Sequence, residues 1–172
     1  HRASIAGWVP YARALHVSLA KVPFVRPYQY PLLVGAVLGT GLPQTVIKTA
    51  SVVIPNNSSF VWTHTLNATL QTAPNGLTSG ASVRMQLYDS ISGPLSNVEV
   101  EVANLAGAIY QTFAAAPRDV RPYPLPEAFT FDRGAVITAT YTVVLTVNDS
   151  NPSLSSVGII LCGYRVLQGD QG

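Results

Sequence analysis

The sequence predicts an all-β protein: an antiparallel, jelly-roll-like sandwich or barrel of about seven to eight strands, preceded by a proline-rich N-terminal arm. Two observations support this prediction. From residue 45 on, apolar and polar residues alternate in runs bounded by Pro, Asn, Gly and Ser, which is typical of half-buried strands and turns. No segment in that part repeats its apolar residues at helical spacing, so we expect no crossover helices and no parallel sheet.

The first 44 residues differ in composition from the rest, and we predict that they form the arm. Prolines recur through this segment and glycines cluster near its end, while residues 11–22 allow at most a turn or two of helix. An ordinary loop leading into a first strand fits this composition, and so does an extended arm that reaches a neighbouring subunit. We therefore divide the chain into an arm, residues 1–44, and a β-domain, residues 45–172.

Alternating runs rich in Val, Ile, Thr and Tyr follow one another in the β-domain, and we expect a strand in each: 45–54, 59–70, 81–88, 98–102, 108–113, 135–147 and 156–167. Turn sequences such as Pro74-Asn75-Gly76 separate them. A jelly roll is the first choice for such a series. An immunoglobulin-like sandwich is the second choice, since the sequence lacks the Cys-Trp-Cys arrangement that would support this fold. An outer-membrane barrel is third, because the contiguous apolar residues around Cys162 suit a buried core better.

Charge is scarce in this chain. Asp, Glu, Lys and Arg make up 10% of the residues, compared with about 25% in typical soluble domains. The basic residues behind the net charge of +2 are scattered, so we expect no nucleic-acid partner. The longest apolar stretch, "PLLVGAVLG" from Pro31, is too short to span a membrane and begins too late for a secretory signal, so we expect a soluble chain. So little charge predicts a surface covered by neighbours, and hence a homo-oligomer.

The sequence offers little for chemistry, and we expect no enzyme, no cofactor and no metal site. His1, His16 and His64 lack metal-binding spacing, and the single cysteine, Cys162, lies in an apolar run as a small buried residue. Glu99 and Glu101 fall on one face of a short strand and are the only candidates for a catalytic carboxylate pair. Same-face glutamates more often protect a sheet edge, which is the interpretation we favour.

Two proline-rich segments share the tetrad Val-Arg-Pro-Tyr: "FVRPYQYPLL", residues 24–33, and "VRPYPLPEAFTF", residues 120–131. We interpret them as stiff straps that either close the ends of their own domain or lie on adjacent subunits, where stiffness reduces the entropy lost on assembly. Aromatic residues and arginine are enriched in interfaces. The predicted interface residues are therefore Arg26, Pro27, Tyr28, Tyr30, Arg121, Pro122, Tyr123 and Phe129.

Three segments, in order, resemble the closing half of small β-barrel virion proteins of bacteriophages: "VRMQLYDSISGPLSNVEVEVANLAG" from Val83, "RPYPLPEAFTFDRGAVITATYTVVLTV" from Arg121, and "VGIILCGYRVL" from Val157. The common order is a strand ending in Asp-Ser, a Leu-Ser-Asn turn, a proline-rich strap, a Phe-x-Phe-x-x-Gly entry to a long strand, and a terminal Gly-Tyr-Arg-Val strand. The resemblance covers about residues 45–167 and does not extend to the proline-rich arm.

This resemblance implies a capsid, decoration or minor head protein of a virion that acts by packing against other shell subunits and has no catalytic residues. The alternative is a lectin-like sandwich on a virion or cell surface, in which Trp8, Trp62 or Tyr88 stacks on sugar rings. Trp62, on an alternating strand, is better explained as a core residue.

Overall fold

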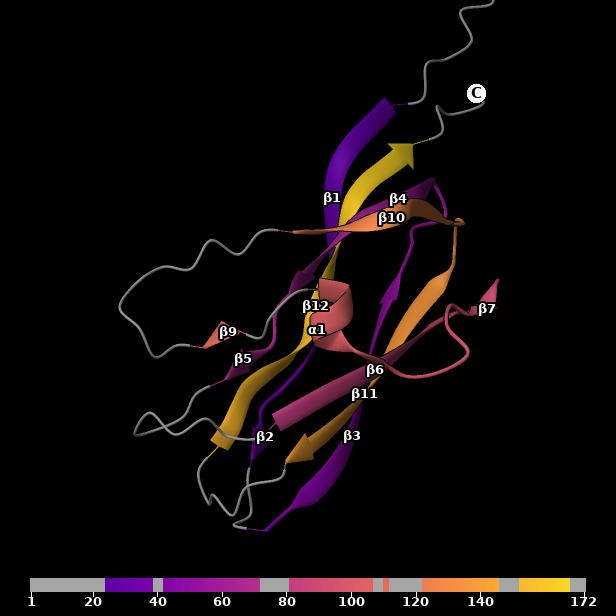
Figure 1. Ribbon diagram of the computed structural model, residues 1–172. Helices are drawn as coiled ribbons and strands as arrows, with labels where there is room; N and C mark the ends of the chain where they lie inside the picture. Colours follow the sequence, from indigo (N-terminus) through magenta and orange to yellow (C-terminus); the bar gives the residue numbers. More distant parts are fainter. Residues whose placement is uncertain are drawn as a thin grey trace, which may run out of the picture.

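Residues 24–38, 42–71, 81–106, 110–111, 122–145 and 152–167 are described by a computed structural model of the chain, and they form a sandwich of two β-sheets (Figure 1). Seven of the described strands have nine or more residues. Long strands pair antiparallel throughout, and the described strands of the two sheets do not join into a closed barrel. The predicted all-β, antiparallel sandwich is confirmed. Residues 11–22, whose sequence allows at most a turn or two of helix, lie outside the described residues.

The larger sheet is organised around β12 (Pro152–Leu167), its longest strand. β4 (Ser58–Asn67) pairs with one side of β12 and β1 (Phe24–Val34) with the other, while β10 (Tyr123–Phe131) pairs with β4. The second proline-rich strap is therefore a strand, β10. Three two-residue strands complete the sheet: β2 (Val37–Leu38), β5 (Leu70–Gln71) and β9 (Tyr110–Gln111).

The smaller sheet has β11 (Val136–Leu145) at its centre, between β3 (Gln44–Val53) and β6 (Ala81–Asp89). Two short strands, β7 (Gly93–Pro94) and β8 (Val100–Glu101), pair with the far side of β6. These long strands coincide closely with three predicted runs, because their alternation matches the burial of every second residue in β6 and β11.

The strand predicted over residues 98–102 is too long at both ends, because only Val100 and Glu101 form a strand, β8. Val100 and Glu101 pair with β6, but α1 (Val102–Ala106) begins directly after them. Val102 and Ala106 lie one helical turn apart and are both buried, so packing against the core favours the helix over continued alternation. Within the described part of the chain, no helix has the length and hydropathy needed to cross a membrane.

β1 falls in the second half of the predicted arm. All 11 of its residues pair with β12 of the same chain, so this part of the arm is a first strand of its own domain. Residues 1–23 lie outside the described residues. The domain boundary at residue 44, and the reach of an arm to a neighbouring subunit, therefore stay predictions.

The prolines of β1 face its open edge. In an antiparallel pair, residues whose N–H and C=O point at the partner strand alternate with residues whose groups point away. Gly158, opposite Leu33, directs its N–H and C=O to the β4 side, so Leu33 points its own groups away from β12. Pro27 and Pro31 alternate in step with Leu33. Their missing N–H groups therefore fall on an edge that no described strand covers.

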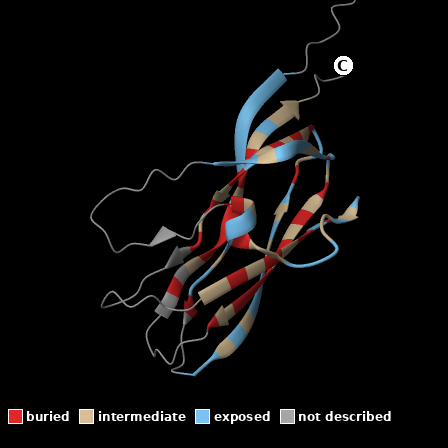
Figure 2. Cartoon of the chain, viewed as in Figure 1, coloured by how far each residue is buried: buried red, intermediate tan, exposed pale blue. Residues whose placement is uncertain are grey.

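Aliphatic and aromatic side chains form the core between the sheets. The buried residues lie along the central strands of both sheets (Figure 2). Phe60 of β4 contacts Tyr30 of β1 with ring centroids 4.8 Å apart and stacks on Phe131 of β10 at 6.3 Å. Trp62, also buried, stacks on Phe131 at 6.1 Å, so its assignment to the core is confirmed. Because these rings come from β1, β4 and β10, aromatic burial attaches both proline-rich strands to the larger sheet.

Tyr141 links the two sheets through its hydroxyl. Its fully buried side chain extends from β11, donates a hydrogen bond to the Leu32 carbonyl of β1 at 2.6 Å, and accepts one from the Ile159 N–H of β12 at 3.2 Å. Leu32 and Ile159 are register partners, so the hydroxyl stands where a direct β1–β12 bond would otherwise form. One side chain thereby satisfies two buried backbone groups of the facing sheet.

We expect the free energy of unfolding to fall as the pH rises above about 10. Burial raises the pKa of Tyr141, although the hydrogen bond from Ile159 offsets part of the rise, and burial also raises the pKa of Tyr30. Below the pKa of an unfolded tyrosine this stability is fully present; above it the unfolded chain loses protons first, and stability declines. Urea denaturation from about pH 8 to pH 12 measures the free energy of unfolding at each pH. Its decline with pH should have a smaller slope in Tyr141→Phe than in the wild type. An equal slope in both proteins would contradict this account.

Candidate functional site

The outer face of the larger sheet carries no charged side chain across β1, β12 and β4. Residues opposite each other in register share one face of a sheet, and the row facing away from the core is uncharged and mostly apolar. We call this set the outer face: Val25, Pro27, Gln29, Pro31, Leu33, Ser59, Val61, His64, Leu66, Ile160, Cys162, Tyr164 and Val166.

The corresponding side of the smaller sheet is different, because it carries charges and hydroxyls. Thr142 of β11 donates to Glu99 at 2.6 Å, and Ser82 of β6 donates to Glu101 at 2.8 Å. Arg84 lies 3.8 Å from the second oxygen of Glu99. Both glutamates are thus held by hydroxyls over the same face, and their role in protecting a sheet edge stays a prediction. The two exposed sides of the sandwich therefore offer partners very different surfaces.

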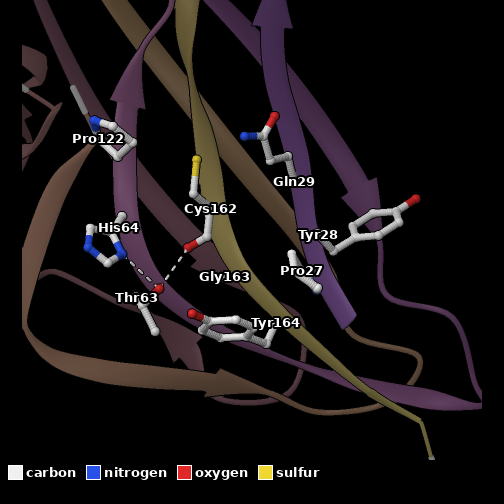
Figure 3. Close-up of a pocket in the computed structure, with 9 residues that line it drawn as sticks. All are labelled: Pro27, Tyr28, Gln29, Thr63, His64, Pro122, Cys162, Gly163 and Tyr164. Atoms are coloured by element: carbon white, nitrogen blue, oxygen red, sulfur yellow. Dashed lines mark hydrogen bonds between the residues drawn. The ribbon is translucent and has the colours of Figure 1, made fainter. Parts of the chain in front are cut away.

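A hollow of about 550 Å³ lies in the outer face (Figure 3). Pro27 of β1 borders it on one side, and Pro122, which directly precedes β10, borders it on the other. The structure therefore brings residues of both predicted straps to one site. The remaining lining residues are Tyr28, Gln29, Thr63, His64, Cys162, Gly163 and Tyr164, and the Tyr28 ring points away from the hollow (Figure 3).

A bulge shapes the floor of this hollow. The register between β12 and β4 shifts between Cys162 and Gly163, and Thr63 is the extra residue on β4. The strands approach so closely here that a Cβ atom at Gly163 would collide with the Val61 carbonyl oxygen, so this position requires glycine.

His64 is fixed in the hollow by its neighbours. The Thr63 hydroxyl donates to the Cys162 carbonyl at 3.3 Å, and its oxygen lies 2.9 Å from His64 Nδ1. Because a hydroxyl has one hydrogen, the Thr63 oxygen accepts from Nδ1. The backbone carbonyl of His64 also accepts a bond from Trp62 Nε1 at 2.8 Å. The exposed, hydrogen-bonded strand histidine expected from the sequence is confirmed.

Cys162 is buried, as expected, although it lies in the floor of the hollow. Burial raises the pKa of its thiol, which disfavours the reactive thiolate, and its Sγ lies 3.7 Å from the Ile160 carbonyl oxygen. Among the described residues, no group of three or more His, Cys, Asp or Glu side chains could hold a metal ion.

The predicted interface residues separate into three groups. Pro27, Tyr28 and Pro122 line the hollow, although the Tyr28 ring points away from it (Figure 3), and Arg26 and Tyr123 are exposed elsewhere on the larger sheet. Their role in an interface stays a prediction.

Two other members of the predicted set belong to the interior of the domain. Tyr30 is 6% exposed and packs on Phe60, so it is not available to a partner. Phe129 is partly buried and contacts Phe131 with ring centroids 4.8 Å apart. Arg121 lies outside the described residues.

Phe129 also helps to cover the gap between the sheets. With Leu125, Pro126 and Glu127 of β10 it lines an apolar cleft of about 270 Å³, whose inner wall includes Trp62. The second strap therefore closes one side of its own sandwich.

Gln29, Thr63 and Tyr164 were missed as site residues by reasoning from the sequence. Gln29 alternates with Pro27 along the first strap, so it shares the face of Pro27, and this signal was present. Thr63 reaches the hollow through the β4–β12 bulge, which no local pattern marks. Tyr164 reaches it by standing opposite Pro27, and this cross-strand register is a property of the folded sheet.

No known protein family matches the sequence, and no curated protein matches it either. Among solved structures, the chain is similar to one in the structure of infectious bursal disease virus, Gx strain, with 10% sequence identity and a TM-score of 0.34. The similarity covers 86% of this chain and 33% of that one, so this chain spans about a third of the length of its match. The fold and surface together define a β-sandwich with one uncharged side and one charged, hydroxyl-bearing side.

Proposed function

We propose that this protein is a structural subunit of a virus particle and that it packs its outer face against other shell proteins. The observation that supports the proposal is the lack of Asp, Glu, Lys and Arg at all 13 outer-face positions. The centres of protein interfaces are depleted in charge and enriched in aromatic residues. An uncharged, largely apolar sheet face of this extent favours association over solvation.

Within this class, we propose a bacteriophage capsid or decoration subunit. The ordered segments from Val83, Arg121 and Val157, which resemble small bacteriophage virion proteins, support this finer assignment. The low overall charge supports a homo-oligomer in the virion.

The direct test is to look for the protein in purified particles from its source. Quantitative mass spectrometry of gradient-purified particles should give a fixed ratio to the other shell proteins, and electron microscopy should place the domain in the shell. Absence from the particles would contradict the proposal.

We expect charge on the outer face to weaken self-association strongly. The double variant Leu33→Glu, Tyr164→Glu places two carboxylates on exposed outer-face positions, each 44% exposed. Their desolvation in a packed interface should weaken self-association at least about 100-fold. Sedimentation at micromolar concentrations measures this. As a matched control, Ile47→Glu introduces charge at a 67% exposed position of the smaller sheet and should associate like the wild type. A monomeric wild type would contradict the expectation.

Carbohydrate binding is the second candidate function. The half-exposed Tyr164 ring borders the hollow, where Gln29, Thr63 and His64 supply polar groups, and sugar sites combine such a ring with hydrogen-bonding side chains. A glycan array separates the two functions. Specific glycan binding that is lost in Tyr164→Ala and kept in Leu33→Glu would favour the lectin-like function over packing.

A further inference from the structure

Two arginines occupy directly opposite positions near the ends of β1 and β12. Arg26 and Arg165 are register partners, and their shared face is the one that continues toward the core residue Phe60. This face lies opposite the outer face described above. Here the strands run past the core, and β1 is exposed from Phe24 to Gln29 (Figure 2). The two guanidinium groups are therefore at a solvent-accessible end of the larger sheet.

Both guanidinium groups are held in place by aromatic rings. Arg26 Cζ lies 4.6 Å from the centroid of the Phe24 ring, and Arg165 Cζ lies 5.0 Å from that of Tyr28. Arg165 also donates from Nε to Ser58 Oγ at 3.1 Å and from Nη2 to Asn57 Oδ1 at 3.2 Å. A guanidinium has five N–H donors, so Arg165 keeps three of them for a ligand, in a fixed orientation.

Among the described residues, no carboxylate neutralises Arg26 or Arg165. The ion pair found there joins Arg84 to Glu99 on the other sheet. Like charges directly opposite each other destabilise a sheet. Residues 1–23, which precede β1, contain no Asp or Glu that could compensate. The buried Tyr30 hydroxyl has no hydrogen-bond partner among the described residues. Burial raises the pKa of Tyr30, and the positive charge of Arg165 offsets part of this rise, so the two side chains are close. Within the described part of the chain, the site thus has surplus positive charge and unused donors.

We propose that Arg26 and Arg165 form a binding site for the carboxylate groups of an acidic segment of a partner protein. Guanidinium forks match carboxylates in a bidentate geometry, and two fixed forks accept two neighbouring carboxylates. A nucleic acid fits less well. Its bases would stack on Phe24 and Tyr28, but each ring already has a guanidinium on one face. Two cations also offer few phosphate contacts. The site is separate from the outer face, so it does not depend on the proposed packing.

The test uses a hexaglutamate peptide as the probe and the full chain labelled with nitrogen-15. Titration at low salt should shift the Nε–Hε signals of Arg26 and Arg165 and leave that of Arg84, which faces Glu99, unchanged. Adding about 0.5 M NaCl should remove the shifts, because screening weakens exposed ion pairs. Absence of saturable shifts at Arg26 and Arg165 would overturn the proposal.

Variants distinguish a built site from general charge attraction. Arg26→Gln and Arg165→Gln should each weaken peptide binding about tenfold, a change of about 1.4 kcal/mol. Arg133→Gln, with the same charge change at an exposed position after β10, should bind like the wild type. An equal loss in Arg133→Gln would overturn the proposal. If Arg165→Gln fails to fold, Arg26→Gln still decides, because Arg26 donates no hydrogen bond to Ser58 or Asn57, the two partners of Arg165.

Two further experiments test whether another group occupies the arginine site. Asp170 follows Arg165 closely in the sequence. Peptide binding that occurs only in Asp170→Asn would mean that the chain's own carboxylate fills the site, and would overturn the proposal. Oligothymidylate is the second competitor. If it binds more tightly than hexaglutamate and depends on the same two arginines, the site recognises phosphate and the proposal fails. Weaker binding of oligothymidylate supports it.

Discussion

Replacing Tyr141 with Phe is expected to lower the free energy of unfolding by about 2 to 4 kcal/mol. The variant keeps the ring and its packing but removes the hydroxyl that binds the Leu32 carbonyl and the Ile159 N–H. Each buried backbone group left without a partner costs about 1 to 3 kcal/mol. The loss therefore measures how strongly the hydroxyl connects β11 to the facing sheet.

Urea denaturation at neutral pH measures this loss, and Tyr164→Phe is the matched control. The Tyr164 side chain is on the exposed outer face, so removal of its hydroxyl should change stability by less than about 0.5 kcal/mol. If Tyr141→Phe were no more destabilising than Tyr164→Phe, β1 and β12 would have closed up to form the direct bond. The hydroxyl would then be a substitute for a ladder bond and not a requirement.

Replacing Gly163 with Ala is expected to destabilise the protein by about 3 kcal/mol and to distort the hollow. The added Cβ would overlap a backbone oxygen, that of Val61, and backbone cannot move aside as the end of a flexible side chain can. Overpacking of this kind typically costs about 1 to 3 kcal/mol, and a clash with backbone falls at the upper end. The β4–β12 bulge must open to admit the methyl group, which also moves Thr63 and His64.

Gly35→Ala is the control for this prediction. A Cβ atom at Gly35 meets no atom within 4 Å, so this variant should match the wild type in thermal and urea midpoints. Amide chemical shifts should change across β4 and β12 in Gly163→Ala and stay local in Gly35→Ala. If the two variants were equally stable, the close approach at Gly163 would not constrain the fold.

Much of the fold could be predicted because alternation and burial agree along the central strands. β11 shows this clearly. Ile137, Ala139, Tyr141 and Val143 face the core, and the threonines that alternate with them point to the other side of the sheet. Residues 102–106 could not be predicted, because the short helix depends on burial of Val102 and Ala106 by other elements. The position of β1 could not be predicted either. Its pairing with β12 joins the two ends of the domain, and proline content alone favours an arm.

The candidate site was predicted only in part, for a related reason. Pro27 and Pro122 were identified because they repeat a local motif, and Arg26 was identified with them. Arg165 was not, since its importance comes from standing opposite Arg26, and cross-strand register is a property of the folded sheet. The absence of charge from the outer face likewise becomes visible only when alternate residues of three distant strands are placed side by side.

The prolines of β1 affect how readily this protein aggregates at high local concentration. A chain with so little charge is at risk of fibril formation, in which one molecule's exposed strand recruits the backbone of the next. Pro27 and Pro31 interrupt the donor pattern that such templating needs, along the edge of the larger sheet that no described strand covers. Sheet-by-sheet polymerisation is therefore discouraged at this border, while contact through side chains stays open. The pyrrolidine rings that stiffen β1 therefore also protect the protein from irreversible aggregation into fibrils.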